Sequence, residues 1–241
     1  MNKNSSKYEA FRFKKFTIQH KLCSMKVGID GVLLGAWANC NDCENILDVG
    51  TGSGLIALML AQRNPTAQIQ AIEIEHSAYL QTQINFNASP WASRLSAEEC
   101  DFTKFSSDVK FDLIISNPPY FSNSYLSGNN ARDIARHTLT LSINNLIEHA
   151  ASLLSDRGKI CLIYPFESTS ELEFNVAKMD LSIKKLTLVK PNSRKSPKRI
   201  LVEITKKTTL KCVNDELLIH LHNGEYASEF IELTKDFYIK F

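Results

Sequence analysis

The residues best suited to chemistry are Asn117, Pro118, Pro119 and Tyr120, which directly follow the apolar run 111–116. Two prolines cannot continue a hydrogen-bonded strand, so the chain must turn here and present the Asn117 side chain and the Pro118 carbonyl. Together these groups can accept hydrogen bonds from one N–H₂ group on a planar molecule. Such bonds stabilise the positive charge that develops when a delocalised nitrogen attacks an electrophile. Because the Tyr120 ring can stack on the planar target, we expect Asn117, Pro118 and Tyr120 to be catalytic.

A glycine-rich turn provides a second candidate site. Asp48 begins the sequence DVGTGSG, which places Gly50, Gly52 and Gly54 between an apolar run and an amphipathic run. Glycines there let the backbone turn sharply and let a cofactor lie against main-chain atoms. The next predicted strand ends in Glu73, whose carboxylate can accept hydrogen bonds from both hydroxyls of an adenosine ribose. This combination predicts a nucleoside-containing cofactor held by Asp48, Gly50, Gly52, Gly54 and Glu73.

Asp101 and Phe102 follow the third predicted strand, where a sheet of this kind contacts the adenine of its cofactor. The carboxylate can accept from the adenine amino group, and the Phe102 backbone N–H can donate to a ring nitrogen. Asp101 is equally suited to cap a helix that begins there. We expect both residues to bind the cofactor.

The spacing of apolar residues predicts the elements that must position these groups. Short apolar runs alternate with longer amphipathic runs, which is typical of an α/β fold with a mostly parallel sheet wrapped by helices. The predicted strands cover residues 45–49, 68–72, 95–100, 111–116, 158–164, 181–189 and 200–206. The predicted helices cover residues 55–63, 77–87, 142–154 and 167–179, and residues 121–140 are expected to form a loop or short helix. The last two strands, joined by a basic loop, predict an antiparallel edge to the sheet.

The two ends of the chain have a different character. Residues 1–44 are basic and aromatic at first and then form a turn and a short apolar helix, which we interpret as a small N-terminal flap. Residues 45–241 are expected to form the catalytic domain, and the whole chain one compact unit.

Positive charge is concentrated in two blocks of the sequence. Residues 1–27 carry a net charge of +6 and residues 184–211 a net charge of +9, while the whole chain carries only +2. Two basic blocks on an acidic body are typical of a protein that binds a polyanion, although solvated surface charge gives the same pattern. The cations best placed to contact phosphates are Arg12, Lys14, Lys15, Arg194, Lys195, Lys198 and Arg199.

Composition and apolar run lengths exclude several classes of protein. The hydrophobic fraction of 44% and the charged fraction of 22% exclude collagen-like and largely disordered chains. The longest apolar runs are too short to cross a membrane, and no secretory signal is present, so we expect a cytoplasmic protein. Cys40 and Cys43 form a single C-x-x-C without a second pair at ligand spacing, and we therefore expect no metal site.

Taken together, the DVGTGSG turn and the NPPY sequence resemble class I S-adenosylmethionine-dependent amino-methyltransferases. A further stretch, FTIQHK from Phe16 to Lys21 followed by MKVGIDGVLLGAW from Met25 to Trp37, resembles the N-terminal motif of the bacterial tRNA1(Val) (adenine(37)-N6)-methyltransferase family. The resemblance extends over nearly the whole chain, including Ala135-Arg136-His137 and Asp236-Phe237-Tyr238. It implies a Rossmann-like, doubly wound sheet and methyl transfer to N6 of adenine 37.

The resemblance also implies particular partners. The methyl donor would be S-adenosyl-L-methionine, with Lys26, Asp30 and the glycine-rich turn lining its methionine end, and Asn117 lying beside it. Ile29 stands where the family commonly has threonine, so no hydroxyl contact is expected at that position. The basic blocks would clamp phosphates of a tRNA anticodon arm, whose single-stranded bases reach a pocket at little cost in unstacking. No obligate protein partner is expected.

Three other functions fit parts of the pattern. A protein glutamine N5-methyltransferase would also present a planar N–H₂ group to NPPY, but two basic blocks favour a nucleic acid. A DNA or ribosomal-RNA adenine-N6 methyltransferase differs from the favoured function only in its substrate. A non-catalytic nucleotide-binding module would leave Asn117 idle, and detection of any methyl transfer would exclude it.

Overall fold

The computed structural model describes residues 10–119, 141–206 and 212–241. Their helices are α1 (Ile29–Trp37), α2 (Leu55–Arg63), α3 (His76–Asn87), α5 (Ile143–Leu153), α6 (Thr169–Lys178) and α7 (Ser228–Thr234), with short 3-10 turns η2 (Ala92–Arg94), η3 (Phe102–Lys104) and η4 (Phe166–Ser168). The strands are β1 (Ala10–Arg12), β2 (Thr17–Gln19), β3 (Asn45–Val49), β4 (Gln68–Glu73), β5 (Leu95–Glu99), β6 (Phe111–Ser116), β7 (Leu154–Pro165), β8 (Ser182–Lys190), β9 (Arg199–Thr205) and β10 (Val213–Leu218). The expected α/β pattern is confirmed, and the predicted loop at 121–140 lies outside the described residues.

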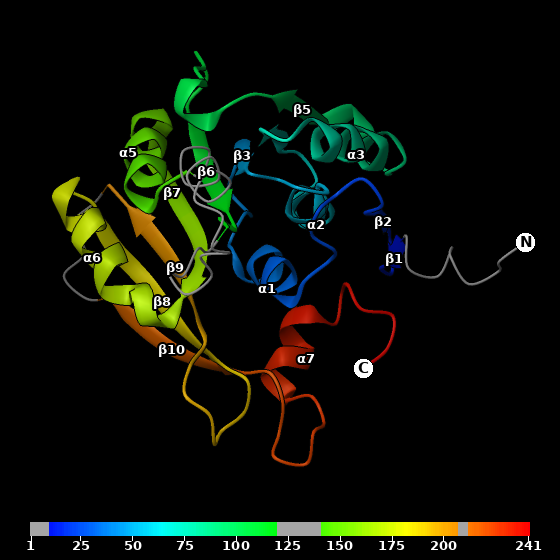
Figure 1. Cartoon of the computed structure of the whole chain (residues 1–241), viewed down its shortest axis with the longest axis vertical. Coiled ribbons are helices and arrows are strands. Elements are labelled where there is room, and N and C mark those ends of the chain that lie inside the picture. The colour runs from blue at the N-terminus through cyan, green and yellow to red at the C-terminus, as the bar shows by residue number, and fades with distance from the viewer. Residues whose placement is uncertain (1–9, 120–140, 207–211) are drawn as a thin grey trace, which may run out of the picture.

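The main sheet has the strand order β10-β8-β9-β7-β6-β3-β4-β5. β9 runs antiparallel to both of its neighbours, β7 and β8, and the other pairings in this sheet are parallel (Figure 1). The antiparallel pair expected from the sequence is therefore present, and β10 adds a parallel strand outside it. With this topology, β3, β4, β6, β8 and β10 all end at the same edge of the sheet.

Alternate residues of the central strands face two separate hydrophobic layers. Ile46, Ile115 and Cys161 belong to the layer formed with α1, α2 and α7. Leu47, Ile114 and Leu162 belong to the layer formed with α5 and α6. Helices therefore cover both faces (Figure 1), as burial of both sides of a parallel sheet requires.

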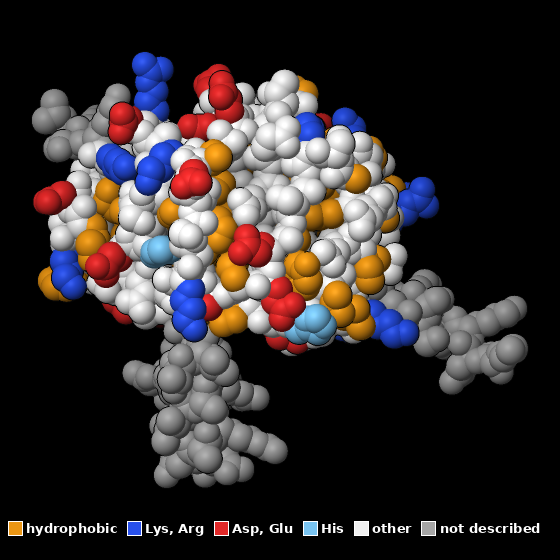
Figure 2. Space-filling model, turned by 90° about the horizontal axis from the view of Figure 1, so that it is seen from above, with side chains coloured by type: hydrophobic (Ala, Val, Ile, Leu, Met, Phe, Trp, Pro, Cys, Tyr) orange, Lys and Arg blue, Asp and Glu red, His pale blue; other side chains and the backbone are white. Residues whose placement is uncertain are grey.

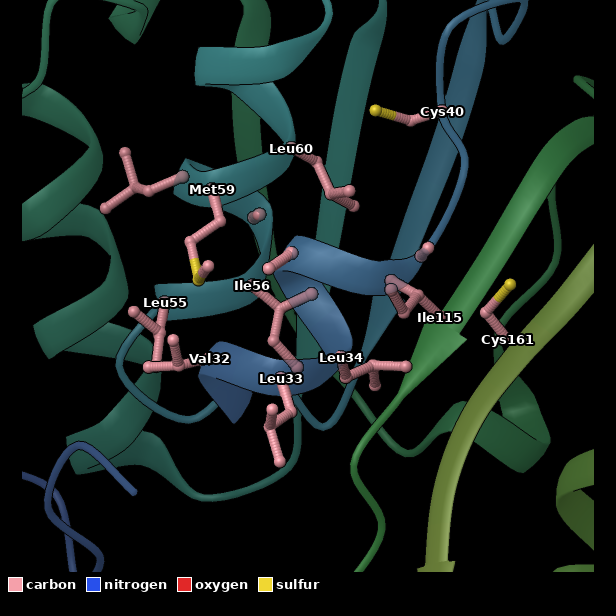
Figure 3. Close-up of a cluster of buried hydrophobic side chains, with 14 of the residues drawn as sticks. Val32, Leu33, Leu34, Cys40, Leu55, Ile56, Met59, Leu60, Ile115 and Cys161 are labelled. Atoms are coloured by element: carbon pink, nitrogen blue, oxygen red, sulfur yellow. The ribbon is translucent and has the colours of Figure 1, made fainter. Parts of the chain in front are cut away.

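Helix α1 is part of the core. Val32, Leu33 and Leu34 are fully buried, and in the close-up of this layer Val32 lies beside Leu55 of α2 (Figure 3). The two helices approach so closely that a Cβ on Gly35 would lie 2.8 Å from the Met59 sulfur. The division of the chain at residue 44 stays a prediction, but residues 29–37 pack in the same layer as α2.

The N-terminal hairpin β1–β2 packs against the C-terminal segment. The Lys14 backbone N–H donates to the Phe237 carbonyl at 2.9 Å, and the Phe11 ring meets the Tyr238 ring edge-on at 6.1 Å. Phe13 and Phe237 are buried. Among the described residues of the first basic block, Phe13 and Phe16 therefore serve the core, while the cations from Arg12 onward lie on the surface.

Candidate active site

The glycine-rich turn after β3 has an unusual backbone. Gly50, Gly52 and Gly54 have φ angles of 69°, 60° and 81°, which side-chain-bearing residues rarely adopt. A Cβ on Gly54 would lie 2.6 Å from the Phe86 ring, whereas Cβ atoms on Gly50 and Gly52 would meet nothing within 4 Å. Gly54 is thus required for packing against α3. The open space at the other two leaves main-chain atoms accessible to a cofactor.

Helix α3 holds this turn through side chains that the sequence did not single out. Thr82 donates from its hydroxyl to the Gly52 carbonyl at 2.7 Å. Asn85 donates from its amide to the carbonyls of Ser53 at 2.7 Å and Gln19 at 2.8 Å. The Asn85 bridge places the predicted N-terminal motif beside the turn. No local pattern identifies such contacts, because the partners are 30 to 66 residues apart.

Asp48 lies under the turn and is fully buried. Its Oδ2 atom accepts from the Thr51 hydroxyl at 2.6 Å and from the Ala57 backbone N–H at 3.1 Å. Burial raises the pKa of this carboxyl to about 7, against the opposing effect of these hydrogen bonds. Its second oxygen, Oδ1, is buried without a hydrogen-bond partner. Such an orphaned acceptor fits a site that is completed by a donor group of a ligand.

Glu73 connects the end of β4 to the same turn. One carboxylate oxygen accepts from the Gly52 backbone N–H at 2.8 Å, and the other accepts from the backbone N–H groups of Ile74 and Glu75. Burial raises the pKa of the Cys23 thiol to about 11, and the charges of Glu73 and Glu75 add to this shift. Ile74, next to Glu73 in the chain, is 49% exposed and offers an apolar surface for an adenine.

Asn117 follows the end of β6 beside the turn. The strand register pairs Val49 with Ser116, so Gly50 and Asn117 are the first residues beyond two adjacent strand ends. The buried Ser116 hydroxyl donates to the Val49 carbonyl at 2.8 Å and fixes this relation. The structure therefore brings the two predicted motifs together. Pro118 is buried next to Asn117, and Tyr120 lies outside the described residues.

Asp101 forms the cap that the sequence allowed as an alternative. Its Oδ1 atom accepts from the Thr103 backbone N–H at 2.9 Å and from the Thr103 hydroxyl at 2.8 Å, at the start of η3. The hydrogen bond from the Thr103 hydroxyl lowers the pKa of this carboxyl. Phe102 is buried and meets the His149 ring edge-on at 4.8 Å. Both residues follow the carboxyl end of β5, at the same sheet edge as the glycine-rich turn. Their contacts with the cofactor stay a prediction.

Two residues predicted for different ligands are paired. Arg199 donates from Nε to Asp30 Oδ2 at 2.8 Å, which joins the amino end of α1 to the start of β9. Asp30 was expected near the cofactor and Arg199 near RNA phosphates. Lys26 is exposed and lies three residues before the start of α1. The pair thus connects the predicted cofactor region with the second basic block.

The other basic residues fall into two groups. Lys184, Lys185 and Lys190 on β8 form ion pairs with Glu203, Asp215 and Glu216, respectively. Arg194, Lys195 and Lys198 are exposed in the loop 191–198 and form no ion pair with the described residues. Arg12, Lys14 and Lys15 are also exposed, and Lys14 donates from Nζ to the Lys235 carbonyl at 2.6 Å. Figure 2 shows the molecule from above relative to Figure 1, which is the side opposite the loop 191–198. Basic and acidic side chains are interspersed on that side.

The described residues also bear on metals and membranes. Within them, no cluster of three or more His, Cys, Asp or Glu side chains is suited to hold a metal ion. Cys40 and Cys43 are buried, and their carbonyls accept from the Asn64 side chain at 2.6 and 2.9 Å. None of the helices in these ranges has the length and apolar character needed to cross a bilayer.

Comparison with known proteins identifies the family. The model of the methyltransferase small domain matches residues 32–190. A tRNA1(Val) (adenine(37)-N6)-methyltransferase from Parabacteroides distasonis is 44% identical over 95% of this chain and 98% of its own length. The enzyme of the same name from Haemophilus influenzae is 43% identical over 96% of this chain and 99% of its own length. This chain belongs to the tRNA1(Val) (adenine(37)-N6)-methyltransferase family.

Solved structures of other methyltransferases share the fold. A predicted O-methyltransferase from Agrobacterium tumefaciens superposes with a TM-score of 0.68 at 19% identity, covering 86% of this chain and 96% of that chain. A ribosomal protein L11 methylase from Lactobacillus delbrueckii gives a TM-score of 0.57 at 17% identity, covering 79% and 84% of the two chains. The expected class I methyltransferase fold is confirmed.

Proposed function

We propose that this protein transfers a methyl group from S-adenosylmethionine to the exocyclic N6 of adenine 37 in tRNA1(Val). The observation that carries the proposal is the adjacency of Gly50 and Asn117 at one edge of the sheet, in a chain of this family. A cofactor on the glycine-rich turn and an amine on Asn117 would then be neighbours, as direct methyl transfer requires.

The residues around the turn fit S-adenosylmethionine. Glu73 offers carboxylate oxygens for the ribose hydroxyls, and the open backbone at Gly50 and Gly52 leaves room for the methionine portion. The unpartnered Oδ1 of Asp48 suits an amino group of the ligand. When bound, the cofactor supplies an electrophilic methyl group on a sulfonium. The protein therefore needs to contribute position and electrostatic complementarity rather than a strong base.

The acceptor amine is oriented by the NPPY sequence. The Asn117 side-chain oxygen and the Pro118 carbonyl accept the two N–H groups of adenine N6, and Tyr120 stacks on the base. These bonds strengthen as positive charge forms on the nitrogen, so they stabilise the transition state more than the ground state. Methyl transfer would leave S-adenosyl-L-homocysteine as the thioether product, and the charged nitrogen would then lose one proton to water.

The RNA contact is proposed to involve the anticodon arm. Arg194, Lys195 and Lys198 carry charge that no described acidic residue neutralises, and their loop leaves β8 at the edge where β6 also ends. Arg12, Lys14 and Lys15 form the second set of proposed phosphate contacts, whereas the charge of Arg199 is neutralised by its ion pair with Asp30. Unneutralised cations near a planar-amine site favour a nucleic acid over a protein glutamine.

Replacement of Glu73 by alanine is expected to weaken S-adenosylmethionine binding by about 1.5–3 kcal/mol, because hydrogen bonds to a charged acceptor are lost. Calorimetric titration measures the effect. Glu73→Gln should lose less, since an amide oxygen can still accept from the Gly52 backbone N–H. Glu98→Ala removes an exposed carboxylate from β5 and serves as the control. Unchanged affinity in Glu73→Ala would limit Glu73 to supporting the turn.

The reaction itself is tested with purified protein, S-adenosylmethionine and unmodified tRNA1(Val). Nucleoside mass spectrometry should find N6-methyladenosine in this tRNA and none in a transcript with guanosine at position 37. A peptide containing the glutamine motif of a release factor should stay unmethylated. Methylation of the peptide in preference to the tRNA would overturn the proposed substrate.

A further inference from the structure

The segment after β10 lies beside the basic loop 191–198. The backbone N–H of Ile219 donates to the Lys190 carbonyl at 3.0 Å, and that of His220 donates to the Pro191 carbonyl at 3.1 Å. The chain then turns and returns through Tyr226, which forms an antiparallel bridge with His220. In Figure 1 both loops project from the lower side of the molecule. They form one surface at the carboxyl ends of β8 and β10.

This surface contains a column of aromatic rings. Phe230 on α7 is buried at 1% exposure and stacks on Tyr226, with ring centroids 4.9 Å apart and an interplanar angle of 17°. Tyr226 stacks in turn on His220 at 4.8 Å and 24°. His220 is half-buried, so the column rises from the core and ends on a ring that reaches the surface. Tyr226 is 38% exposed, and Phe241, which meets its edge, is 46% exposed.

The half-buried His220 ring and the exposed Tyr226 ring lie beside unneutralised cations, a combination that suits a nucleic acid strand. Arg194, Lys195 and Lys198 supply the charge, and no carboxylate among the described residues pairs with them. Unpaired nucleobases stack on aromatic side chains, while the adjoining phosphates need cations. A column anchored in the core presents its ring with little loss of side-chain freedom on binding.

The distance between this surface and Asn117 is one that a single RNA strand can span. Four strand-to-strand steps separate β6 from β10, which corresponds to about 19 Å at about 4.8 Å per step. Stacked nucleotides rise about 3.4 Å each, so about five or six of them span this distance. An RNA whose target base lies at Asn117 can therefore reach the column with another part of the same strand.

We propose that His220, supported by Tyr226 and Phe230, stacks on an unpaired nucleobase of the tRNA substrate, while Arg194, Lys195 and Lys198 hold the neighbouring phosphates. This inference rests on the proposed function, because it takes tRNA as the ligand. It adds a base-binding contact that is separate from the methyl-transfer site.

The test compares His220→Ala with His222→Ala, which removes an exposed histidine two residues further along the same segment. The first variant should raise the KM for tRNA by about 10-fold, within the range of one lost stacking contact, and leave kcat and S-adenosylmethionine affinity unchanged. His222→Ala should behave like the wild type. His220→Phe should restore the KM, because a phenyl ring stacks without the hydrogen-bonding groups of histidine.

Direct tRNA binding, measured by fluorescence anisotropy without the cofactor, separates this inference from the function. If the wild-type protein binds tRNA but does not methylate it, the proposed function is overturned. The stacking contact is then tested by comparing the tRNA affinity of His220→Ala with that of the wild type. An unchanged KM and binding affinity in His220→Ala would overturn the stacking contact. Failure of His220→Phe to rescue would show that the imidazole acts in some way other than stacking.

Discussion

Replacement of Asn117 by alanine is expected to lower the rate of methyl transfer by about 100- to 1000-fold, which is the typical loss when one hydrogen bond to the transition state is removed. Affinity for S-adenosylmethionine should stay nearly unchanged. The reason is positional: Asn117 follows β6, whereas the turn proposed to hold the cofactor follows β3 and is supported by Thr82 and Asn85. Single-turnover kinetics measure the chemical step, and calorimetric titration measures the affinity.

Two controls make this result specific. Asn214→Ala removes an exposed asparagine from β10, far from the sheet edge where Asn117 lies, and should be silent. Asn117→Asp keeps an oxygen acceptor at the site and should retain more activity than the alanine variant. If Asn117→Ala loses cofactor affinity as severely as Gly52→Arg, which obstructs the turn, Asn117 is structural and the assigned role is wrong.

Much of the fold could be predicted because its signals are local. The run 55–63 was predicted as a helix and forms α2 with the same bounds, since Asn64 and Pro65 end it within the sequence itself. The strands before Gly50 and Asn117 were predicted from uninterrupted apolar runs, and parallel strands place their carboxyl ends at one edge. The meeting of the two motifs therefore followed from the predicted topology, and the register of Val49 with Ser116 agrees with it.

Other features depend on contacts that no local pattern encodes. The pair of Arg199 with Asp30 joins residues 169 positions apart. The support of the turn by Asn85, and the stacking of His220 on Tyr226, likewise depend on how distant elements pack. The sequence also indicated two basic blocks without showing which cations are neutralised. Only the fold separates Lys184, which is paired with Glu203, from Lys195, which has no such partner among the described residues.

The cations of the loop 191–198 form no ion pair within the described part of the chain and are expected to contribute strongly to tRNA binding. Changing Arg194, Lys195 and Lys198 together to glutamate is expected to weaken tRNA binding strongly and to flatten its dependence on salt. Each phosphate contact that is lost should reduce the magnitude of the slope of log affinity against log salt by roughly 0.7–0.9. Binding titrations over a range of salt concentrations measure this slope. S-adenosylmethionine affinity should survive, because the turn lies after β3 and the loop 191–198 leaves β8, four strand-to-strand steps away in the sheet.

A matched triple variant distinguishes contact from net charge. Lys110, Arg157 and Lys178 are exposed, and they lie near the opposite, amino-terminal edge of the sheet, before or early in β6, β7 and β8. Their change to glutamate alters the net charge of the protein by the same amount. A long-range electrostatic effect would weaken tRNA binding in both triple variants, and it would be screened by salt alike. Local phosphate contacts predict a lower slope only in the variant of the loop 191–198. If that variant binds and methylates tRNA like the wild type at moderate salt, the loop is solvated surface and the RNA reaches Asn117 by another path.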